Sequence, residues 1–221
     1  AVRDKLSIGV LHNPDEEISS IHSEPWILEE AKKAAYVLVC ESARADGSLV
    51  NRRKGSATFG LHFHGIASHA GNDPEKGRSA VVEMAHWILE LGKHNDYANG
   101  TSLTIGLVKG GSASNVVPEY AEATLDLRFW DNNKFDEIKA LLDKLAAKPF
   151  VDGVKVEVRV QAKKPAMVMN AGTEKLMHFV EAAGKKIGLP ITWQAVGGGS
   201  DANVTSAHGI PSLDGFGPIG A

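Results

Sequence analysis

The sequence predicts an α/β protein in which a ferredoxin-like domain is inserted into a second domain built on a parallel sheet. Three observations support this prediction. Apolar runs typical of buried strands alternate with a helix near the start of the chain and return near its end. Between them, the segments follow the order β-α-β-β-α-β. The pattern changes at two basic stretches, so residues 1–52 and 165–221 are assigned to the parallel-sheet domain and residues 53–164 to the insert.

The parallel-sheet domain begins with residues 6–11, an apolar run that suits a buried strand. A helix follows from Ser23, as N-cap, to Ala35, with Pro25 in its first turn. Residues 36–40 form a second strand, and a strand-helix-strand unit of this kind builds a parallel sheet. After the insert, the pattern predicts a helix over residues 173–187 and a strand over residues 191–196. A short helix that starts near Asp201 and a last strand over residues 211–213 follow.

The insert begins with an alternating strand over residues 58–66 and a helix over residues 78–91. Its remaining strands are expected at residues 103–108, 123–130 and 154–160. Its second helix is expected at residues 135–145, between the last two of these strands. In the helix 78–91, the polar residues Ser79, Glu83, His86 and Glu90 form one stripe. The remaining apolar arc is wide for a helix that lies on one sheet, so a second surface is expected to cover it.

Composition excludes two classes of partner. The formal net charge of −3 produces no field that would attract nucleic acid or anionic lipid. No apolar run approaches the roughly 20 residues that cross a bilayer. Cys40 is the only cysteine, so an intramolecular disulfide is impossible. The compartment stays open between cytoplasm and periplasm.

Acidic side chains follow the two predicted strands of the first domain. The triplet Asp15-Glu16-Glu17 comes after residues 6–11, at the strand end where α/β sheets place their sites. Three adjacent carboxylates repel one another, so a cation would stabilise them, although a solvated acidic loop is the common alternative. Glu41 ends the next strand and is expected beside the triplet. With Glu41 included, a metal centre and a solvated loop are about equally supported.

Three histidines of the insert are candidates for chemistry. His69 lies in a loop of small residues, where a histidine is more often simply exposed. His62 and His64 share one face of a strand and can hold a metal. Without a third ligand nearby, a solvent-facing side of the sheet is the favoured interpretation of this pair.

Anion-binding groups occur in both domains. Asn115 follows a Gly-rich loop and Arg128 lies on the next strand, and an Arg and an Asn held by a sheet can clamp a carboxylate. The alternative for Arg128 is an ion pair with Asp126. The Gly197–Gly199 run opens a helix and can cradle an anion, but it lacks the Lys of a nucleotide-binding loop.

Taken together, these motifs resemble the dinuclear zinc exopeptidase family of glutamate carboxypeptidase, aminoacylase and succinyl-diaminopimelate desuccinylase. The closest likeness is to glutamate carboxypeptidase. The resemblance rests on DEEISS at residues 15–20, GIASHAG at 65–71, KGGSASNVVPE at 109–119, DLRF at 126–129 and GGGSDAN at 197–203. They occur in the family's order and cover nearly the whole chain.

The resemblance implies a zinc metallopeptidase that releases a glutamate-like C-terminal amino acid from a peptide or an N-acyl amino acid, with two zinc ions per chain. The insert would be a dimerisation domain that forms a homodimer. Because His69 lies on the insert and the three glutamates lie on the other domain, we expect His69 to serve the neighbour's substrate. The implied roles are general base for Glu16, zinc ligands for Glu17 and Glu41, oxyanion stabilisation for His69, and binding of the substrate carboxylate for Asn115, Arg128 and the Gly199 backbone.

The sequence departs from the family pattern. An upstream His-x-Asp motif, a metal-bridging Asp and a final His are not present, so three of the family's five ligands are absent, and Ser19 stands at a position that is usually Gly. We therefore expect an internal fragment that is inactive alone, with an incomplete zinc-exopeptidase domain. A non-catalytic dimerisation or ligand-binding module and an aminoacylase-type deacylase are the alternatives. The acyl specificity cannot be read from spacing.

Overall fold

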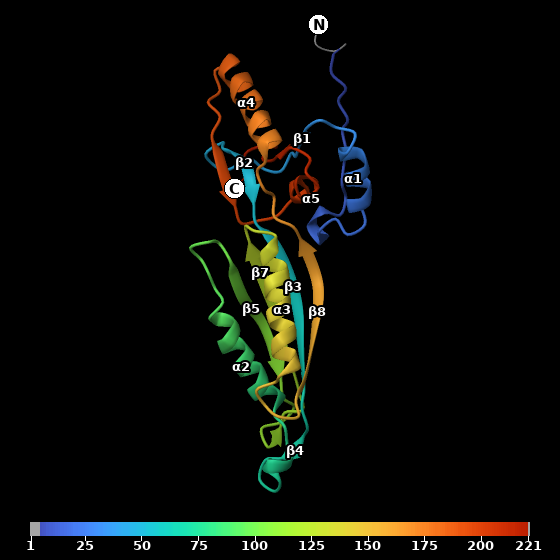
Figure 1. Cartoon of the computed structure of the whole chain (residues 1–221), viewed down its shortest axis with the longest axis vertical. Helices are drawn as coiled ribbons and strands as arrows, with labels where there is room; N and C mark the ends of the chain where they lie inside the picture. The colour runs from blue at the N-terminus through green and yellow to red at the C-terminus, as the bar shows by residue number, and fades with distance from the viewer. Residues whose placement is uncertain (1–4, 221) are drawn as a thin grey trace. The chain divides into compact units, whose positions relative to one another are not determined.

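The structure is a computed structural model that describes residues 5–220 (Figure 1). The chain divides into two compact units, each described here by itself. Unit 1 comprises Ala1–Arg52, Met167–Ala195 and Ser200–Ala221, and unit 2 comprises Arg53–Ala166 and Val196–Gly199.

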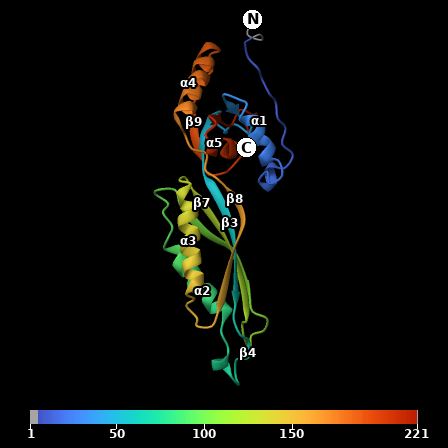
Figure 2. The same cartoon turned by 45° about the vertical axis from the view of Figure 1, so that its right-hand side comes forward.

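Unit 2 is built on one four-stranded antiparallel sheet. Its elements, in chain order, are β3 (Gly55–His64), α2 (Ala80–Gly92), β5 (Ser102–Gly110), β7 (Tyr120–Phe129), α3 (Asn133–Ala147) and β8 (Lys155–Lys164). The strand order in the sheet is β5-β7-β3-β8, and every neighbouring pair is antiparallel. Both helices lie on the same face of the sheet (Figures 1 and 2). The predicted ferredoxin-like insert is therefore confirmed.

The core of unit 2 lies between the sheet and its two helices. Side chains alternate across the strands, so Phe59, Leu61 and Phe63 of β3 point to the helices and are fully buried. Trp87 of α2 and Leu142 of α3 are fully buried opposite them. The other face of the sheet carries the alternate, more exposed side chains of β3 and β7, and it is called the open face of unit 2.

Helix α2 differs from the prediction at one residue. Glu83, expected on the polar stripe, is fully buried, because its carboxylate accepts hydrogen bonds from the Trp87 indole at 2.8 Å and from the Val151 backbone nitrogen at 2.6 Å. Each oxygen of the buried Glu83 carboxylate thus has a hydrogen-bond donor, as buried polar groups generally do. The wide apolar arc remains uncovered within the described chain: Val82 is 48% exposed and Leu89 is 70% exposed.

Unit 2 also carries a small two-stranded sheet beyond the main one. In it, β4 (Ser68–His69) pairs antiparallel with β6 (Val116–Val117), and the 3₁₀ turn η3 (Pro74–Lys76) follows β4. This sheet is called the tip, defined as residues 65–77 and 111–118.

Unit 1 consists of shorter elements. They are η2 (Glu16–Ile18), α1 (Glu24–Ala31), β1 (Val37–Leu38), β2 (Leu49–Arg53), α4 (Ala171–Lys186), β9 (Trp193–Val196), α5 (Asp201–Ala207) and β10 (Ser212–Leu213). Strand β1 pairs parallel with β10, as expected for a parallel-sheet domain, and β2 pairs with β9. Helix α1 begins after Ser23, as predicted, and ends before the predicted Ala35. Across residues 5–220, no helix is long and apolar enough for a membrane span.

The predicted first strand, residues 6–11, is wrong. This segment is irregular, and its apolar side chains are solvent-exposed, with Leu6 at 63%, Ile8 at 82% and Val10 at 78%. A strand needs a neighbour to pair its backbone groups, and no strand within residues 5–220 pairs with this segment. The predicted strand-helix-strand unit therefore does not form, and β1 pairs with β10 instead.

Candidate functional site

The acidic triplet lies in a tightly bonded turn of unit 1. The Asp15 carboxylate accepts hydrogen bonds from the Ser23 hydroxyl and, at 2.9 Å, from the His22 backbone nitrogen. The Ser23 bond, followed by the His22 bond, holds the pKa of Asp15 below its ordinary value. Asp15 therefore serves the turn itself, whereas Glu16 and Glu17 open η2.

The turn leaves η2 through two residues in the left-handed region. Ser19 has φ +69° and Ser20 has φ +53°, a conformation that favours glycine. This accounts for the expectation of Gly at position 19: the backbone there needs positive φ, and serine adopts it with strain.

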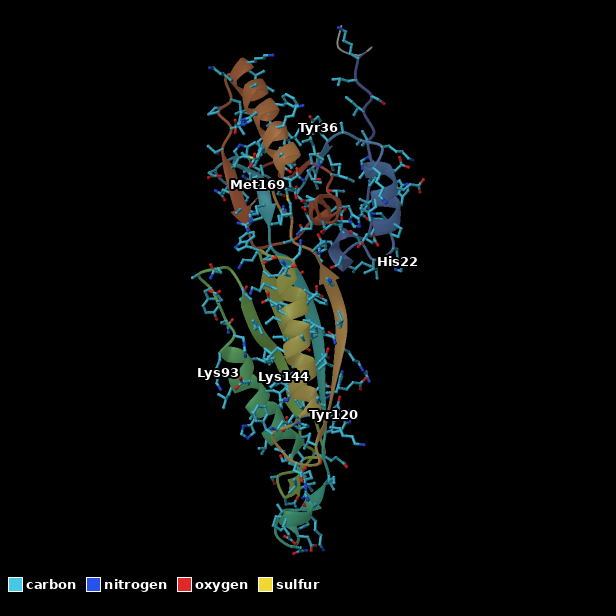
Figure 3. All side chains as sticks on the ribbon, viewed as in Figure 1. His22, Tyr36, Lys93, Tyr120, Lys144 and Met169 are labelled. Carbon is cyan, nitrogen blue, oxygen red and sulfur yellow. The ribbon has the colours of Figure 1, made fainter. Side chains whose placement is uncertain are left out.

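Three side chains hold this turn against α5. Asn13 donates through Nδ2 to Ser20 Oγ at 2.9 Å and to Asp201 Oδ2 at 2.6 Å. Ser20, which is fully buried, donates from its hydroxyl to Asp201 Oδ1 at 2.5 Å. His22, labelled in Figure 3, lies at the end of the same turn. We call Asn13, Ser20 and Asp201 the clamp.

Glu41 lies beside the last described segment of unit 1. The Glu41 carbonyl accepts a hydrogen bond from the Gly217 nitrogen at 2.9 Å. A Cβ at position 217 would approach the Cys40 and Glu41 carbonyl oxygens to 2.5 and 2.8 Å, so only glycine fits. The pairing expected to carry Glu41 to the triplet does not form, because residues 6–11 are not a strand.

No complete metal site forms in the part of the chain that the structure describes. No three side chains of His, Cys, Asp or Glu lie together there in a way that would hold an ion. The pair His62 and His64 faces the open side of the sheet, where His62 Nδ1 and the Tyr120 hydroxyl are 2.9 Å apart.

The Gly-rich run leads into α5. Ser200 is the N-cap of this helix, accepts from the Ala202 nitrogen and forms a capping box with Asn203. Gly197 has nothing within 4 Å of an added Cβ, and Gly198 has only Arg53 Nη1 at 3.9 Å. Neither has a positive φ. Local packing therefore does not require glycine at these two positions, and Gly199 is exposed beside them.

The tip of unit 2 brings His69 and Asn115 together. His69 pairs with Val116 across β4 and β6, and the Ala70 nitrogen donates to the Asn115 carbonyl at 2.9 Å. His69 Nδ1 accepts from the backbone nitrogens of Gly71 and Asn72, at 3.1 and 3.2 Å. Since Nδ1 accepts two hydrogen bonds, the neutral ring carries its proton on Nε2, which is left as a donor.

Arg128 lies at the other end of the sheet from the tip. It pairs with Ser56 of β3, whereas the tip adjoins the other end of the sheet, where β7 begins at Tyr120 (labelled in Figure 3). Eight residues of strand separate the two ends by about 26 Å. Arg128 donates from Nε and Nη2 to both oxygens of Asp126, at 2.8 and 2.9 Å. A single unit 2 therefore does not bring Arg128 and Asn115 to the same carboxylate.

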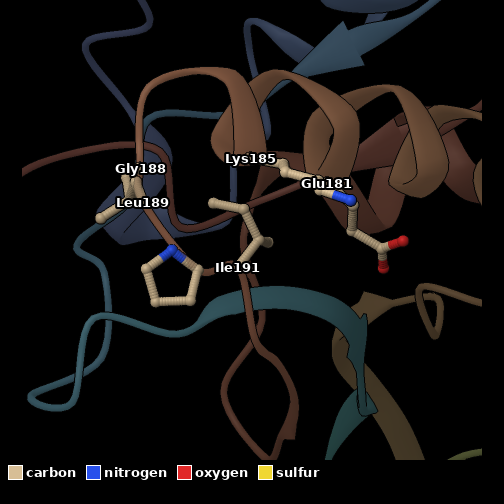
Figure 4. A pocket seen from close by; sticks show the side chains of 6 residues that line it. Glu181, Lys185, Gly188, Leu189 and Ile191 are labelled. Atoms are coloured by element: carbon tan, nitrogen blue, oxygen red, sulfur yellow. The ribbon is translucent and has the colours of Figure 1, made fainter.

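An open hollow of about 420 Å³ lies at the C-terminal end of α4 in unit 1 (Figure 4). It is lined by Glu181, Lys185, Gly188, Leu189, Pro190 and Ile191. None of the residues predicted for the site lines it. The hollow is therefore not assigned to the chemistry of the acidic turn.

The sequence did not reveal the clamp. Asp201 and Ser20 belong to motifs that were recognised, but Asn13 belongs to none, and the contact between Asn13 and Asp201 spans 188 positions. Periodicity reports local structure only, so it contains no signal for such a contact.

The comparison with known proteins agrees with these motifs. Residues 51–154 match the peptidase dimerisation domain. The chain is 34% identical to "Carboxypeptidase G2" of Pseudomonas sp. strain RS-16, over 98% of this chain and 52% of that protein. It is 31% identical to "Succinyl-diaminopimelate desuccinylase" of Psychrobacter arcticus, over 94% of this chain and 54% of that protein. The chain thus spans about half the length of the curated relatives it matches.

Among solved structures, the aminopeptidase PepT of Bacillus cereus superposes with a TM-score of 0.69 at 28% identity. The match covers 87% of this chain and 53% of that one. The matched region includes elements of both units, because neither unit alone makes up 87% of this chain.

Proposed function

We propose that the whole protein is a dimeric metallopeptidase that releases a C-terminal, glutamate-like amino acid, because residues 51–154 match the peptidase dimerisation domain. The carrying observation is the 34% identity to a carboxypeptidase across 98% of this chain, which includes the acidic turn, the tip and the Gly-rich run. Substrates would be short peptides or N-acyl amino acids. The similarity to a desuccinylase supports testing N-acyl amino acids with different acyl groups as well as peptides.

Within this proposal, Glu16 is the general base and Glu17 a metal ligand. Asp15 is engaged by Ser23 and His22, which supports giving the chemical roles to the two carboxylates that follow it. Glu16 would take the proton of the attacking water and pass it to the leaving amine. Positioned proton transfer of this kind contributes roughly 10² to 10⁴ in rate.

Zinc is proposed for the complete protein, not for residues 1–221 alone. A catalytic zinc generally has three protein ligands, and this chain offers Glu17 and Glu41. When bound, zinc lowers the pKa of a water molecule and polarises a carbonyl. We expect residues 1–221 to bind zinc weakly and not as a pair. Submicromolar binding of two zinc ions in calorimetry would contradict this.

The proposed homodimer forms through α2 and β5. Strand β5 is at an edge of the sheet, and its Leu107 and Val108 are 69% and 58% exposed. Leu89 and Val82 of α2 add exposed apolar surface on the adjoining helix. Pairing of two β5 edges by a two-fold axis would cover the unpaired backbone groups and the apolar arc together.

The proposed substrate site uses residues from both subunits. His69 and Asn115 share the tip and are proposed to serve the partner's substrate together, with His69 Nε2–H donating to the oxyanion. Arg128 lies at the opposite end of the sheet and is proposed to bind the substrate carboxylate in its own subunit. Its Nε and Nη2 face Asp126, so the Nη1 side would receive the substrate.

Gly199 is proposed to bind the same carboxylate through its backbone nitrogen. The adjacent Gly197 and Gly198 are not required by packing, which is consistent with a run kept open for close approach of a ligand.

The proposal is tested by purifying the full-length protein with zinc and assaying peptides and N-acyl amino acids that end in glutamate. Release of the C-terminal amino acid is expected, and chelation should abolish it. If the zinc-loaded dimer hydrolyses none of these substrates, the alternative of a non-catalytic dimerisation module is favoured.

A further inference from the structure

Asp201 links two segments that lie far apart in sequence. Its Oδ1 accepts from the Ser20 hydroxyl at 2.5 Å, and its Oδ2 accepts from Asn13 Nδ2 at 2.6 Å. Asn13 and Ser20 stand on either side of the triplet that contains Glu16 and Glu17. One carboxylate therefore ties both ends of the acidic turn to the first residue of α5.

The turn needs such support because its backbone is strained. Ser19 and Ser20 both have positive φ, which non-glycine residues hold only when their surroundings impose it. Ser20 is fully buried, and its hydroxyl accepts from Asn13 while donating to Asp201. A hydrogen bond to an ionised acceptor is roughly twice as strong as one between neutral groups. Asp201 is thus the strongest partner available to this strained residue.

Asn13 carries the link to the other end of the turn. Its Oδ1 accepts from the Asp15 backbone nitrogen at 3.0 Å. Because Asn13 Nδ2 is bonded to Asp201 at the same time, the orientation of the amide is fixed at both ends. Loss of the Asp201 carboxylate would remove the acceptor of the Ser20 hydroxyl and one of the two acceptors of Asn13 Nδ2.

From this geometry we infer that Asp201 is a positioning residue that holds Glu16 and Glu17 through Asn13 and Ser20. The inference rests on the proposed roles of the two glutamates. Capping of α5 is a different role for a carboxylate in a first helical turn, and Ser200 already caps that helix with Asn203. Positioning and helix capping predict different outcomes when the carboxylate is removed.

The test compares Asp201→Ala and Ser20→Ala with a matched control, Ser206→Ala, in the full-length protein. Ser206 lies on the same helix, and its hydroxyl exchanges two hydrogen bonds with the Val168 backbone, at 3.1 and 2.9 Å, away from the clamp. Amide hydrogen exchange is measured at Ser20 and His22, because these two amides donate hydrogen bonds to Asp15 within the turn. This measurement is made without zinc. Turnover and KM are measured with zinc bound.

We expect Asp201→Ala and Ser20→Ala to speed exchange of the Ser20 and His22 amides at least tenfold. We also expect kcat to fall roughly ten- to a hundredfold with KM unchanged, because small displacements of a reacting group cost rate rather than binding. Ser206→Ala should leave both readouts within twofold. Asp201→Asn, which keeps an acceptor for Ser20, should have a smaller effect on exchange than Asp201→Ala, and it replaces Asp201→Ala if that variant does not fold.

Unchanged exchange in the Asp201 variants, or an equal kcat loss in Ser206→Ala, would overturn the inference. The exchange measurement requires no activity, so its failure is distinguishable from failure of the proposed function. If the full-length protein proved inactive, faster exchange in Asp201→Ala would still establish the clamp.

Discussion

The Ala70 backbone nitrogen donates a hydrogen bond to the Asn115 carbonyl at 2.9 Å, and this bond fixes the loop of Asn115 to the strand of His69. The two candidate residues are therefore carried by one rigid element, the tip. Arg128 lies in β7 of the four-stranded sheet, about 26 Å along the strand from Tyr120, at the end of that sheet far from the tip. In a dimer, residues of one tip should act together, and Arg128 should act in the other subunit.

Complementation between variants that are impaired on free-acid substrates tests this arrangement. When full-length His69→Ala is mixed with Arg128→Ala and subunits exchange, one site of each mixed dimer has all its residues. Activity should return to about a quarter of wild type, since half the dimers are mixed and each has one competent site. His69→Ala mixed with Asn115→Ala should stay inactive. Recovery of activity in the second mixture would show that His69 and Asn115 serve different sites, and it would contradict the proposed arrangement.

Arg128→Ala is expected to raise KM for free-acid substrates and to spare amidated ones, because the guanidinium is proposed to bind the α-carboxylate. Arg159→Ala is the matched control: Arg159 makes the same two-bond pair with Glu157 on the open face, at 2.7 Å for both bonds. Steady-state kinetics on the two substrate types provide the measurement. Equal damage to both types by Arg128→Ala would contradict its assigned role.

Gly217→Ala is expected to weaken zinc binding by the full-length protein about tenfold or more, as changes behind a ligand do. The added Cβ would approach the Cys40 and Glu41 carbonyl oxygens to 2.5 and 2.8 Å and so displace Glu41. Gly92→Ala is the control, because nothing lies within 4 Å of its added Cβ. Competition with a chromophoric chelator measures the affinity. Unchanged affinity in Gly217→Ala would remove Glu41 from the ligand set.

Glu181 is expected to contribute to acid unfolding. The Trp193 indole donates to it at 2.8 Å, and this bond, followed by the one with His178, lowers the pKa of Glu181. A carboxylate with a lowered pKa contributes stability above its unfolded pKa of about 4.3, and that contribution is lost as pH falls through the folded value.

Glu181→Gln retains an acceptor for the indole and removes the titration, so its unfolding free energy should fall less steeply below about pH 4.3 than that of wild type. Urea titrations between pH 3 and 7, followed by circular dichroism, measure this slope. Glu174→Gln, on the same helix, is the control for loss of a charge. Parallel slopes for wild type and Glu181→Gln would contradict the assignment.

Much of unit 2 could be predicted from sequence because its information is local. Alternation around Phe59, Leu61 and Phe63 defined a strand, and helical spacing defined α2. Glu83 was misjudged because a residue's place on a helical stripe does not reveal a buried donor such as the Trp87 indole. Apolar residues 6–11 were misjudged because strand formation depends on a neighbour that the pattern does not contain.

The candidate site was predicted less completely. Its residue types and motifs were recognisable, but their grouping depends on contacts between distant segments. The pairing of β4 with β6 associates His69 with Asn115 rather than with Arg128, and the clamp connects Asn13 to Asp201. Neither relationship has a signature in local spacing.

The proposed roles of Glu16 and Glu17 are tested most directly by measuring the zinc content and the turnover of full-length Glu16→Ala. If Glu16 moves the proton, the variant should retain the zinc content of the wild type and lose roughly a hundredfold or more in turnover. Glu17→Ala should lose zinc under the same conditions. Zinc loss in Glu16→Ala together with full zinc retention in Glu17→Ala would contradict the account.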